Sequence, residues 1–362
     1  MWYSSPPRVS FLPFPILLVG IVFLAGCGEE PTASTAPPSA SPELATGSLG
    51  SWTTKVPMPT PRAGLAGAVV QNASAQYLFY AIGGRNENNS AMRRVEAYNA
   101  ATNSWTRRAN LPFDRTDASA AAIGGKIYLV GGFNLTGVLT KTLYVYAQAT
   151  NTWTKKASLP VGSNRAISGV IGGKLYVVTG DVNGSRLYRY DPATDAWTRR
   201  ADPQKTHLGG IGGVIDGKLY VAWGRTFQTT DPYRASFTVD VYNPATNQWT
   251  TKLTYAYAGG LDGQGLCDLD IDIDCGVSSP AGVVFQKKLY VIGGGNDDET
   301  MPLTFAYDPI TNTWTDKADL HFSRESRPIA GTVRNAAGSA RIVVTGGFAE
   351  GEPVSATEMY IP

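Results

Sequence analysis

The sequence predicts an all-β fold made of six copies of one four-stranded unit, and three repeating features support this prediction. The chain of 362 residues contains 40 Gly and 23 Pro, which suits short strands joined by tight turns better than helices. Six tryptophans recur along the chain, and five of them follow a tyrosine by seven residues. Upstream of each tyrosine lies a short apolar run that ends in glycine. A recurring period of this kind indicates repeated units that pack against their neighbours.

The tyrosine and the tryptophan of each unit are expected on the two strands of a hairpin. The turn between them carries Thr followed by Asn or Asp, and in three units Pro follows the opening Asp or Asn. Pro fixes φ for such a turn, and Asn or Asp tolerates its left-handed position. The five pairs are Tyr98 and Trp105, Tyr146 and Trp153, Tyr190 and Trp197, Tyr242 and Trp249, and Tyr307 and Trp314.

Two further strands precede this hairpin in each unit. The second strand is apolar along its whole length, as in KLYVIGG, and the first is rich in small residues, as at 63–70 and 166–171. Strands that are apolar on both faces imply sheets packed face to face. Small residues suit the innermost strand beside a crowded central channel, and glycine pairs suit places where a side chain would clash with the next unit.

This pattern resembles the Kelch repeat, whose marks are a double glycine, a spaced tyrosine and tryptophan, and a period of about 50 residues. The resemblance covers residues 51–362 and implies a six-bladed Kelch-type β-propeller. Trp52 has no tyrosine before it, and Tyr360 has no tryptophan after it. We therefore expect the strand around Trp52 to complete the last blade and to close the ring, which removes exposed sheet edges.

The first 26 residues are interpreted as a lipoprotein signal peptide. An apolar run at 16–25 is too short to cross a bilayer as a helix. It ends in Leu-Ala-Gly-Cys, which resembles the lipobox of bacterial lipoproteins and implies lipidation of Cys27; an ordinary cleaved signal peptide is the alternative. Residues 27–50 hold few large apolar side chains and are predicted to form a disordered tether.

These features predict a lipid-anchored, extracytoplasmic protein of the bacterial cell envelope, on the outer membrane in a Gram-negative host because Gly28 follows the cysteine. Lys plus Arg number 31 against 29 Asp plus Glu, and this balance argues against a nucleic-acid partner. We expect membrane contact through the lipid anchor only, and a monomer.

The predicted ligand-binding residues lie in loops, because the repeats themselves are structural. In Kelch proteins one face gathers the loops after the glycine pairs and the loops that join successive blades. Cations recur in both sets here, and convergent guanidinium groups at a channel mouth would favour a carboxylate or phosphate ligand. The alternative is that these side chains pack between blades and fix the loops. The candidates are Arg62, Arg85, Arg115, Arg165, Arg225, Arg327 and His207.

Glu325 and Glu87 lie in the same two loop sets and are the candidate general bases if the protein is an enzyme. A surface ion pair is the simpler interpretation of each. Neither histidine adjoins a tyrosine, so the copper site of the Kelch-like sugar oxidases is not reproduced. The G-x-S-x-G and H-E-x-x-H motifs are absent from the sequence.

An insertion at about 255–280 interrupts the period between the fourth and fifth blades. Because an extracytoplasmic compartment favours oxidation, a disulfide between Cys267 and Cys275 is predicted. The four aspartates between these cysteines could present oxygen atoms to Ca²⁺, although the run lacks the Gly and terminal Glu of an EF-hand loop. Repelling carboxylates on a solvated hairpin are the favoured interpretation, and no cofactor is required. These aspartates are Asp268, Asp270, Asp272 and Asp274.

Three functional hypotheses follow from these features. The first is a non-catalytic, surface-anchored module that recognises a glycan or a protein, an anionic one included, through the arginine-bearing loop face. The second is an enzyme that resembles the periplasmic Kelch sialic acid epimerases, an epimerase or mutarotase whose arginines would hold a sugar carboxylate. The third is a structural component of an envelope assembly. An inward-facing glutamate beside several arginines would favour the enzyme, whereas a recognition module needs only an exposed concave face.

Overall fold

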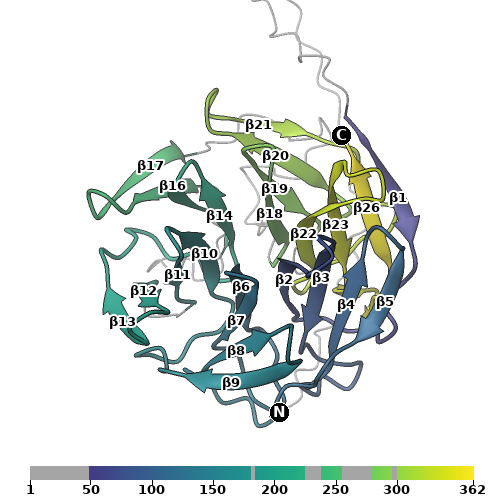
Figure 1. Ribbon diagram of the computed structural model, residues 1–362. Helices are drawn as coiled ribbons and strands as arrows, with labels where there is room; N and C mark the ends of the chain where they lie inside the picture. The colour runs from purple at the N-terminus through teal and green to yellow at the C-terminus, as the bar shows by residue number, and fades with distance from the viewer. Residues whose placement is uncertain (1–48, 181–183, 225–237, 255–278, 296–299) are drawn as a thin grey trace, which may run out of the picture. The chain divides into compact units, whose positions relative to one another are not determined.

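The strands of this chain form six four-stranded antiparallel sheets, arranged around a common axis in the computed structural model (Figure 1). The structure describes residues 49–180, 184–224, 238–254, 279–295 and 300–362, and residues 47–362 form one unit. No segment within the described residues is a helix that is long and apolar enough to cross a membrane. An all-β propeller with six blades is therefore confirmed.

In every blade the four strands run in order from the central channel to the outer rim. The first blade comprises β2 (Ala66–Gln71), β3 (Tyr77–Ile82), β4 (Val95–Asn99) and β5 (Ser104–Arg107). The second comprises β6 (Ser119–Ile123), β7 (Lys126–Val130), β8 (Leu143–Ala147) and β9 (Thr152–Lys156). The third comprises β10 (Ile167–Ile171), β11 (Lys174–Val178), β12 (Leu187–Asp191) and β13 (Ala196–Arg199). The fourth blade comprises β14 (Ile211–Ile215), β15 (Lys218–Ala222), β16 (Thr238–Asn243) and β17 (Gln248–Thr254). The fifth comprises β18 (Ala281–Phe285), β19 (Lys288–Ile292), β20 (Thr304–Asp308) and β21 (Thr313–Asp316). The sixth comprises β22 (Ile329–Arg334), β23 (Ala340–Thr345), β26 (Thr357–Ile361) and β1 (Ser51–Lys55). A short hairpin of β24 (Phe348–Ala349) and β25 (Glu352–Pro353) follows β23.

The two ends of the folded chain share the sixth blade. Strand β1 pairs with β26, and Trp52 lies opposite Tyr360 in this register. Inner strands of successive blades contact one another around the axis, and β22 contacts β2 to complete the circle. Four-stranded blades that meet in this way leave few strand edges exposed.

In five of the blades the recurring tyrosine, tryptophan and Asn or Asp connect the blade to the one before it. In the second blade the Tyr146 hydroxyl donates to Asn151 Oδ1 at 2.7 Å, and the same oxygen accepts from the Ala109 amide at 2.9 Å. Trp153 Nε1 then donates to the Ala109 carbonyl at 3.1 Å. Asn151 has a φ of +53°, which Asn tolerates better than most residues. These hydrogen bonds form a latch, in the sense that they join neighbouring blades. The residues of the repeat signature are therefore structural.

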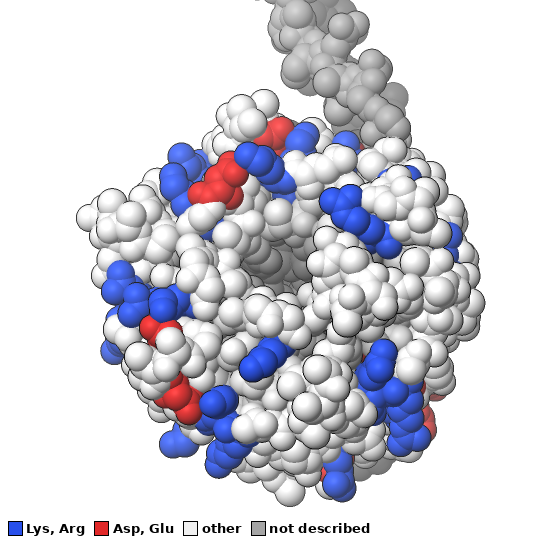
Figure 2. Space-filling view, viewed as in Figure 1, with Lys and Arg blue, Asp and Glu red and all other residues white. Residues whose placement is uncertain are grey.

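The inner strands are small because neighbouring blades approach closely at the channel. A Cβ atom added to Gly67 on β2 would lie 2.9 Å from Ile329 Cβ on β22, and one added to Gly282 on β18 would lie 2.5 Å from Ile211 Cβ on β14. Both distances are too short for carbon atoms in contact. This crowding leaves a narrow axial channel, visible as the central hollow in Figure 2.

Candidate binding site at the mouth of the central channel

Six residues, one just before each inner strand, form a ring at one end of the channel, and backbone hydrogen bonds link several of them. Asp117 donates its amide hydrogen to the Gly64 carbonyl and Arg165 donates to the Asp117 carbonyl, both at 2.8 Å. Arg327 donates to the Ser279 carbonyl at 2.9 Å. The equivalent position in every blade has a left-handed φ between +47° and +71°, although non-glycine residues adopt this region rarely. These six positions are Gly64, Asp117, Arg165, Gly209, Ser279 and Arg327.

Three guanidinium groups lie around the Asp117 carboxylate, two of them from this ring and the third from Arg85 outside it. Arg165 Nε lies 3.4 Å from Asp117 Oδ1, and Arg85 Nη1, from the β3–β4 loop, lies 3.6 Å from Asp117 Oδ2. Arg327 interacts electrostatically with both Asp117 and Arg165. We call Arg85, Asp117, Arg165 and Arg327 the mouth cluster. Three positive charges and one negative charge give it a formal charge of +2.

Each arginine of the mouth cluster retains donor capacity. Among the described residues, the buried atoms Nε of Arg85, Nε of Arg165 and Nη1 of Arg327 have no hydrogen-bond partner. Leaving a buried donor unpaired costs about 1–3 kcal/mol, and more when the group is charged. Burial lowers the pKa of Arg327 to about 10, so this side chain is still protonated at neutral pH. The cluster is therefore suited to accept a further anion.

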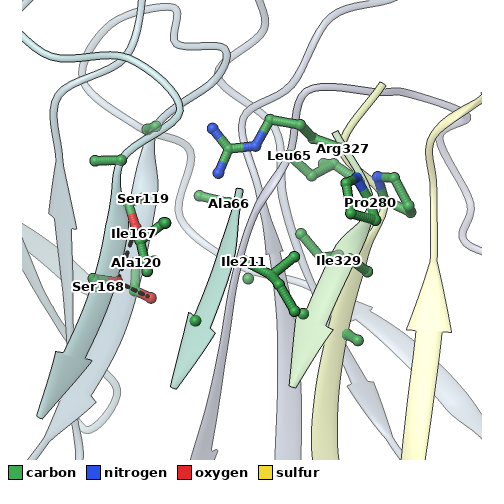
Figure 3. Close-up of a pocket in the computed structure, with 18 of the residues that line it drawn as sticks. Leu65, Ala66, Ser119, Ala120, Ile167, Ser168, Ile211, Pro280, Arg327 and Ile329 are labelled. Atoms are coloured by element: carbon green, nitrogen blue, oxygen red, sulfur yellow. Dashed lines mark hydrogen bonds between the residues drawn. The ribbon is translucent and has the colours of Figure 1, made fainter. Parts of the chain in front are cut away.

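Below the cluster lies a cavity of about 120 Å³. The first residues of the six inner strands line it, and Figure 3 shows the Arg327 side chain extending over its mouth toward Ser119. The hydroxyls of Ser119 and Ser168 are hydrogen-bonded at 2.8 Å on its wall. Pockets for drug-sized ligands enclose about 300–1,000 Å³. This cavity therefore has room for a small group such as a carboxylate, and is too small for a whole drug-sized molecule.

The prediction that Arg62 faces a ligand is wrong. Its side chain is fully buried and lies 2.5 Å from Glu96 Oε2 on β4 of the same blade. Its other donors reach the carbonyl oxygens of Thr60, Ala81 and Gly83 at 2.8–3.0 Å. Every nitrogen of this guanidinium is used inside the blade, so Arg62 fixes its own loop.

His207 and Arg115 are corrected for the same reason, because both are buried against their own blades. His207 Nε2 lies 2.9 Å from Asp240 on β16, and Nδ1 lies 3.0 Å from the Trp223 carbonyl. Arg115 donates to Thr140 at 2.5 Å and stacks on the ring of Phe113 at 4.4 Å. Neither side chain belongs to the mouth cluster.

The acids that bind these buried cations share one spacing in the sequence. Glu96, Asp240 and Glu358 each lie two residues before the repeat tyrosine of their blade. Glu358 binds Arg324, another blade-joining cation, at 2.5 Å. In these three blades an acid at this spacing binds one buried cation of the preceding loop. Asp117 was missed as well, although aligning the six ring positions would have found it.

The two candidate general bases lie on different loops. Glu87 is exposed at the tip of the β3–β4 loop, where the Asn88 side chain donates to it at 3.4 Å. Glu325 is half-buried and pairs through its backbone with Phe348 at 2.9 Å in both directions. The carboxylate that contacts Arg85 and Arg165 is that of Asp117.

Several predicted sites lie outside the described residues: the lipidated Cys27, Arg225, the Cys267–Cys275 disulfide and the four aspartates from 268 to 274. Within the described ranges, no group of three or more His, Cys, Asp or Glu side chains is placed to hold a metal ion.

Comparisons with known proteins agree with the six-bladed ring and its repeat residues. The KLHDC2/KLHL20/DRC7 Kelch-repeats domain matches residues 39–209, and the Kelch motif matches residues 212–252 and 277–321. Among solved structures, that of YjhT superposes with a TM-score of 0.61 at 17% sequence identity, covering 83% of this chain and 95% of YjhT. An identity this low supports the fold alone. Together the family matches span well over half of the sequence, and the chain belongs to the Kelch-repeat β-propeller family.

Proposed function

We propose that this protein is a non-catalytic recognition module that binds an acidic group of a protein or glycan at the mouth of its central channel. The observation that carries the proposal is the mouth cluster, in which three arginines surround one carboxylate and the buried atoms Nε of Arg85 and Nη1 of Arg327 have no hydrogen-bond partner among the described residues. An incoming carboxylate would satisfy these donors and balance the excess positive charge through charge-assisted hydrogen bonds.

A binding role fits this geometry better than proton transfer. Both carboxylate oxygens of Asp117 already face guanidinium groups, at 3.4 and 3.6 Å. A general base needs a carboxylate that can reach the proton of its substrate, and Asp117 is only 3% exposed at its side chain. The cavity beneath is also too small to enclose a whole sugar ring with its substituents.

The predicted lipid anchor on Cys27 and the tether to residue 50 complete this proposal. They would hold the propeller at the surface of an envelope membrane, with the channel mouth free to meet an extracytoplasmic ligand. An envelope location is part of the proposal and rests on the sequence of residues 1–50.

A thermal-shift series on residues 47–362 tests this function, because a ligand that binds only the folded state raises Tm. Acetate, glucuronate and N-acetylneuraminate should each raise Tm, and neutral glucose should not. Arg327→Gln and Arg165→Gln should weaken carboxylate binding at least tenfold. Arg199→Gln is the matched control, since Arg199 lies on the outer strand β13 and pairs with Asp202.

Carboxylate shifts that persist in Arg327→Gln and Arg165→Gln, or an equal shift with glucose, would overturn the proposal. The same samples test the enzyme alternative by NMR of the N-acetylneuraminate anomers. Protein-dependent acceleration of anomer exchange would replace recognition with an epimerase or mutarotase function.

A further inference from the structure

The end of the channel opposite the mouth cluster is surrounded by the hairpin turns between the first and second strands of the blades. These turns follow the inner strands, whereas Asp117, Arg165 and Arg327 of the mouth cluster precede them. From the last residue of the first strand to the second residue of the next, the six hairpins hold seven cations and one acid, Asp216. We call this surface the hairpin face. Its cations are Lys126, Lys174, Lys218, Lys287, Lys288, Arg334 and Arg341.

The repeat itself gathers most of these cations at one end of the channel. Four blades begin their second strand with lysine, at the first residues of β7, β11, β15 and β19. Corresponding positions of a radially repeated unit lie at the same end of the axis and at a similar distance from it. The lysines therefore form a ring, which Lys287, Arg334 and Arg341 extend in the fifth and sixth blades.

The hairpin face keeps an excess of positive charge after its acids are counted. The turns between the third and fourth strands lie at the same end and add Asp191, Asp195 and Asp308. Seven cations against four acids leave a formal side-chain charge of +3, although the whole chain carries only +2. Three lysines pair with these acids at 2.6–3.1 Å, whereas the exposed Lys126 and Lys218 form no ion pair with a described residue. The face therefore favours a partner with a negatively charged surface.

The N-terminal tether meets the propeller at this same face. In the sixth blade Ser51 pairs with Ile361, so β1 begins beside the end of the third strand, next to the C-terminus in Figure 1. The third strand ends at the hairpin face because neighbouring strands of the blade are antiparallel. The Leu49 carbonyl accepts hydrogen bonds from the Tyr360 hydroxyl at 2.7 Å and from the Ala318 amide at 2.9 Å. These contacts fix the point at which the tether joins the folded domain.

The predicted lipid anchor would bring a bilayer within reach of the hairpin face. Cys27 lies 22 residues before Leu49, and a flexible chain of that length has an r.m.s. span of about 26 Å. The face would then meet the bilayer at a high effective concentration, so that individually weak contacts act together. Lysine and arginine side chains near a membrane are attracted to anionic headgroups, over a Debye length of about 8 Å at physiological ionic strength.

We infer that the hairpin face binds the surface of an anionic lipid bilayer, with its cations on the phosphate groups of the lipids. We favour a bilayer over a soluble polyanion because the tether begins on this face. The inference goes beyond the proposed function, with which it shares only the predicted tether, and it adds a second membrane contact to the lipid anchor. It also orients the propeller, since a bilayer at the hairpin face leaves the mouth cluster directed away from the membrane.

Vesicle sedimentation of residues 47–362, the unit that carries all six blades, tests this inference without the anchor. The vesicles contain either phosphatidylcholine alone or equal parts of phosphatidylcholine and the anionic phosphatidylglycerol. At low salt the partition coefficient should be at least tenfold higher for the anionic vesicles. Raising the salt from about 0.05 to about 0.5 M should remove most of this difference, because salt screens the charges.

Variants that each remove two positive charges locate the contact. Lys126→Gln with Lys218→Gln should weaken binding to anionic vesicles at least fivefold. The matched control is Lys141→Gln with Lys155→Gln, which removes two exposed lysines from the β7–β8 loop and the outer strand β9. This control should change binding by less than twofold, and circular dichroism confirms that both variants are folded.

Equal binding to the two kinds of vesicle, or equal losses in the two double variants, would overturn the inference. Acetate titration of the same samples separates this result from the proposed function, because acetate binds at the mouth cluster and should be unaffected by either double variant. Acetate binding without vesicle binding would leave the proposed function standing and refute the membrane contact. Vesicle binding without acetate binding would do the reverse.

Discussion

Arg324 and Arg327 lie three residues apart in one blade-joining loop, yet the structure gives them opposite surroundings. Arg324 is fully buried, contacts Glu358 at 2.5 Å and donates to the Ala356 carbonyl at 3.0 Å. Arg327 lies over the central cavity, and its buried Nη1 has no hydrogen-bond partner in the described residues. Arg324 therefore stabilises the fold, whereas Arg327 keeps a donor atom without a hydrogen-bond partner at the channel mouth.

In three blades an acid on the third strand binds the buried cation of the preceding loop. Arg62 meets Glu96, His207 meets Asp240, and Arg324 meets Glu358. The arginines of the mouth cluster instead share Asp117, which leaves an excess of positive charge at the channel.

Glu358→Gln should destabilise the protein by about 3–5 kcal/mol, because it leaves the buried Arg324 charge without its partner. Chemical denaturation measures this loss as a change in the free energy of unfolding. Glu352→Gln is the control, since Glu352 is exposed on β25, and it should change stability by less than about 0.5 kcal/mol. Equal stabilities of the two variants would contradict a structural role for the Arg324–Glu358 pair.

Arg327→Met should keep or slightly raise stability at pH 7, by up to about 1 kcal/mol, and should abolish carboxylate binding. Burial lowers the pKa of Arg327 to about 10. An arginine whose pKa is lower in the folded protein destabilises the fold while it is charged, below that pKa. Methionine removes this cost. Denaturation at pH 7 measures the effect, and a loss of more than about 2 kcal/mol would show that Arg327 is structural.

The sequence predicted the architecture well because its repeated residues each have a direct contact to make. Tyr146, Asn151 and Trp153 form one latch between blades, and glycines such as Gly67 occupy positions where a side chain would collide. These requirements recur in each blade, so they appear in the sequence as a period.

The site could be predicted only in part. Arg85, Arg165 and Arg327 were identified from their loops, but Asp117, which gathers them, was not. Arg62, Arg115 and His207 were predicted to bind a ligand, because a loop position alone does not show whether a cation already has hydrogen-bond partners within its blade. That depends on contacts across the blade, such as Arg62 with Glu96.

Lowering the pH should remove the stability that the His207–Asp240 contact contributes, a smaller loss than that expected for Glu358→Gln. Burial alone would raise the pKa of Asp240, but hydrogen bonds from His207 and Thr251 outweigh it and lower that pKa. A carboxyl with a lowered pKa stabilises the fold above its unfolded value, about 3.9, and loses this contribution as the pH falls toward its folded value. Asp240→Asn should therefore be less stable than the parent protein at pH 6, and the difference should shrink below pH 4.

A gap between Asp240→Asn and the parent protein that stays constant from pH 6 to pH 3 would contradict this assignment. Asp216→Asn supplies the control, because Asp216 forms an exposed pair with Lys287. Such pairs contribute little to stability.

An acetate titration followed through the arginine Nε–H resonances tests the central claim most directly. The account predicts that the signals of Arg85, Arg165 and Arg327 shift together with one affinity, whereas those of Arg62 and Arg324 stay unchanged. Signals of the mouth cluster that do not move, or that move no more than those of Arg62 and Arg324, would contradict the claim that the channel mouth is an anion-binding site.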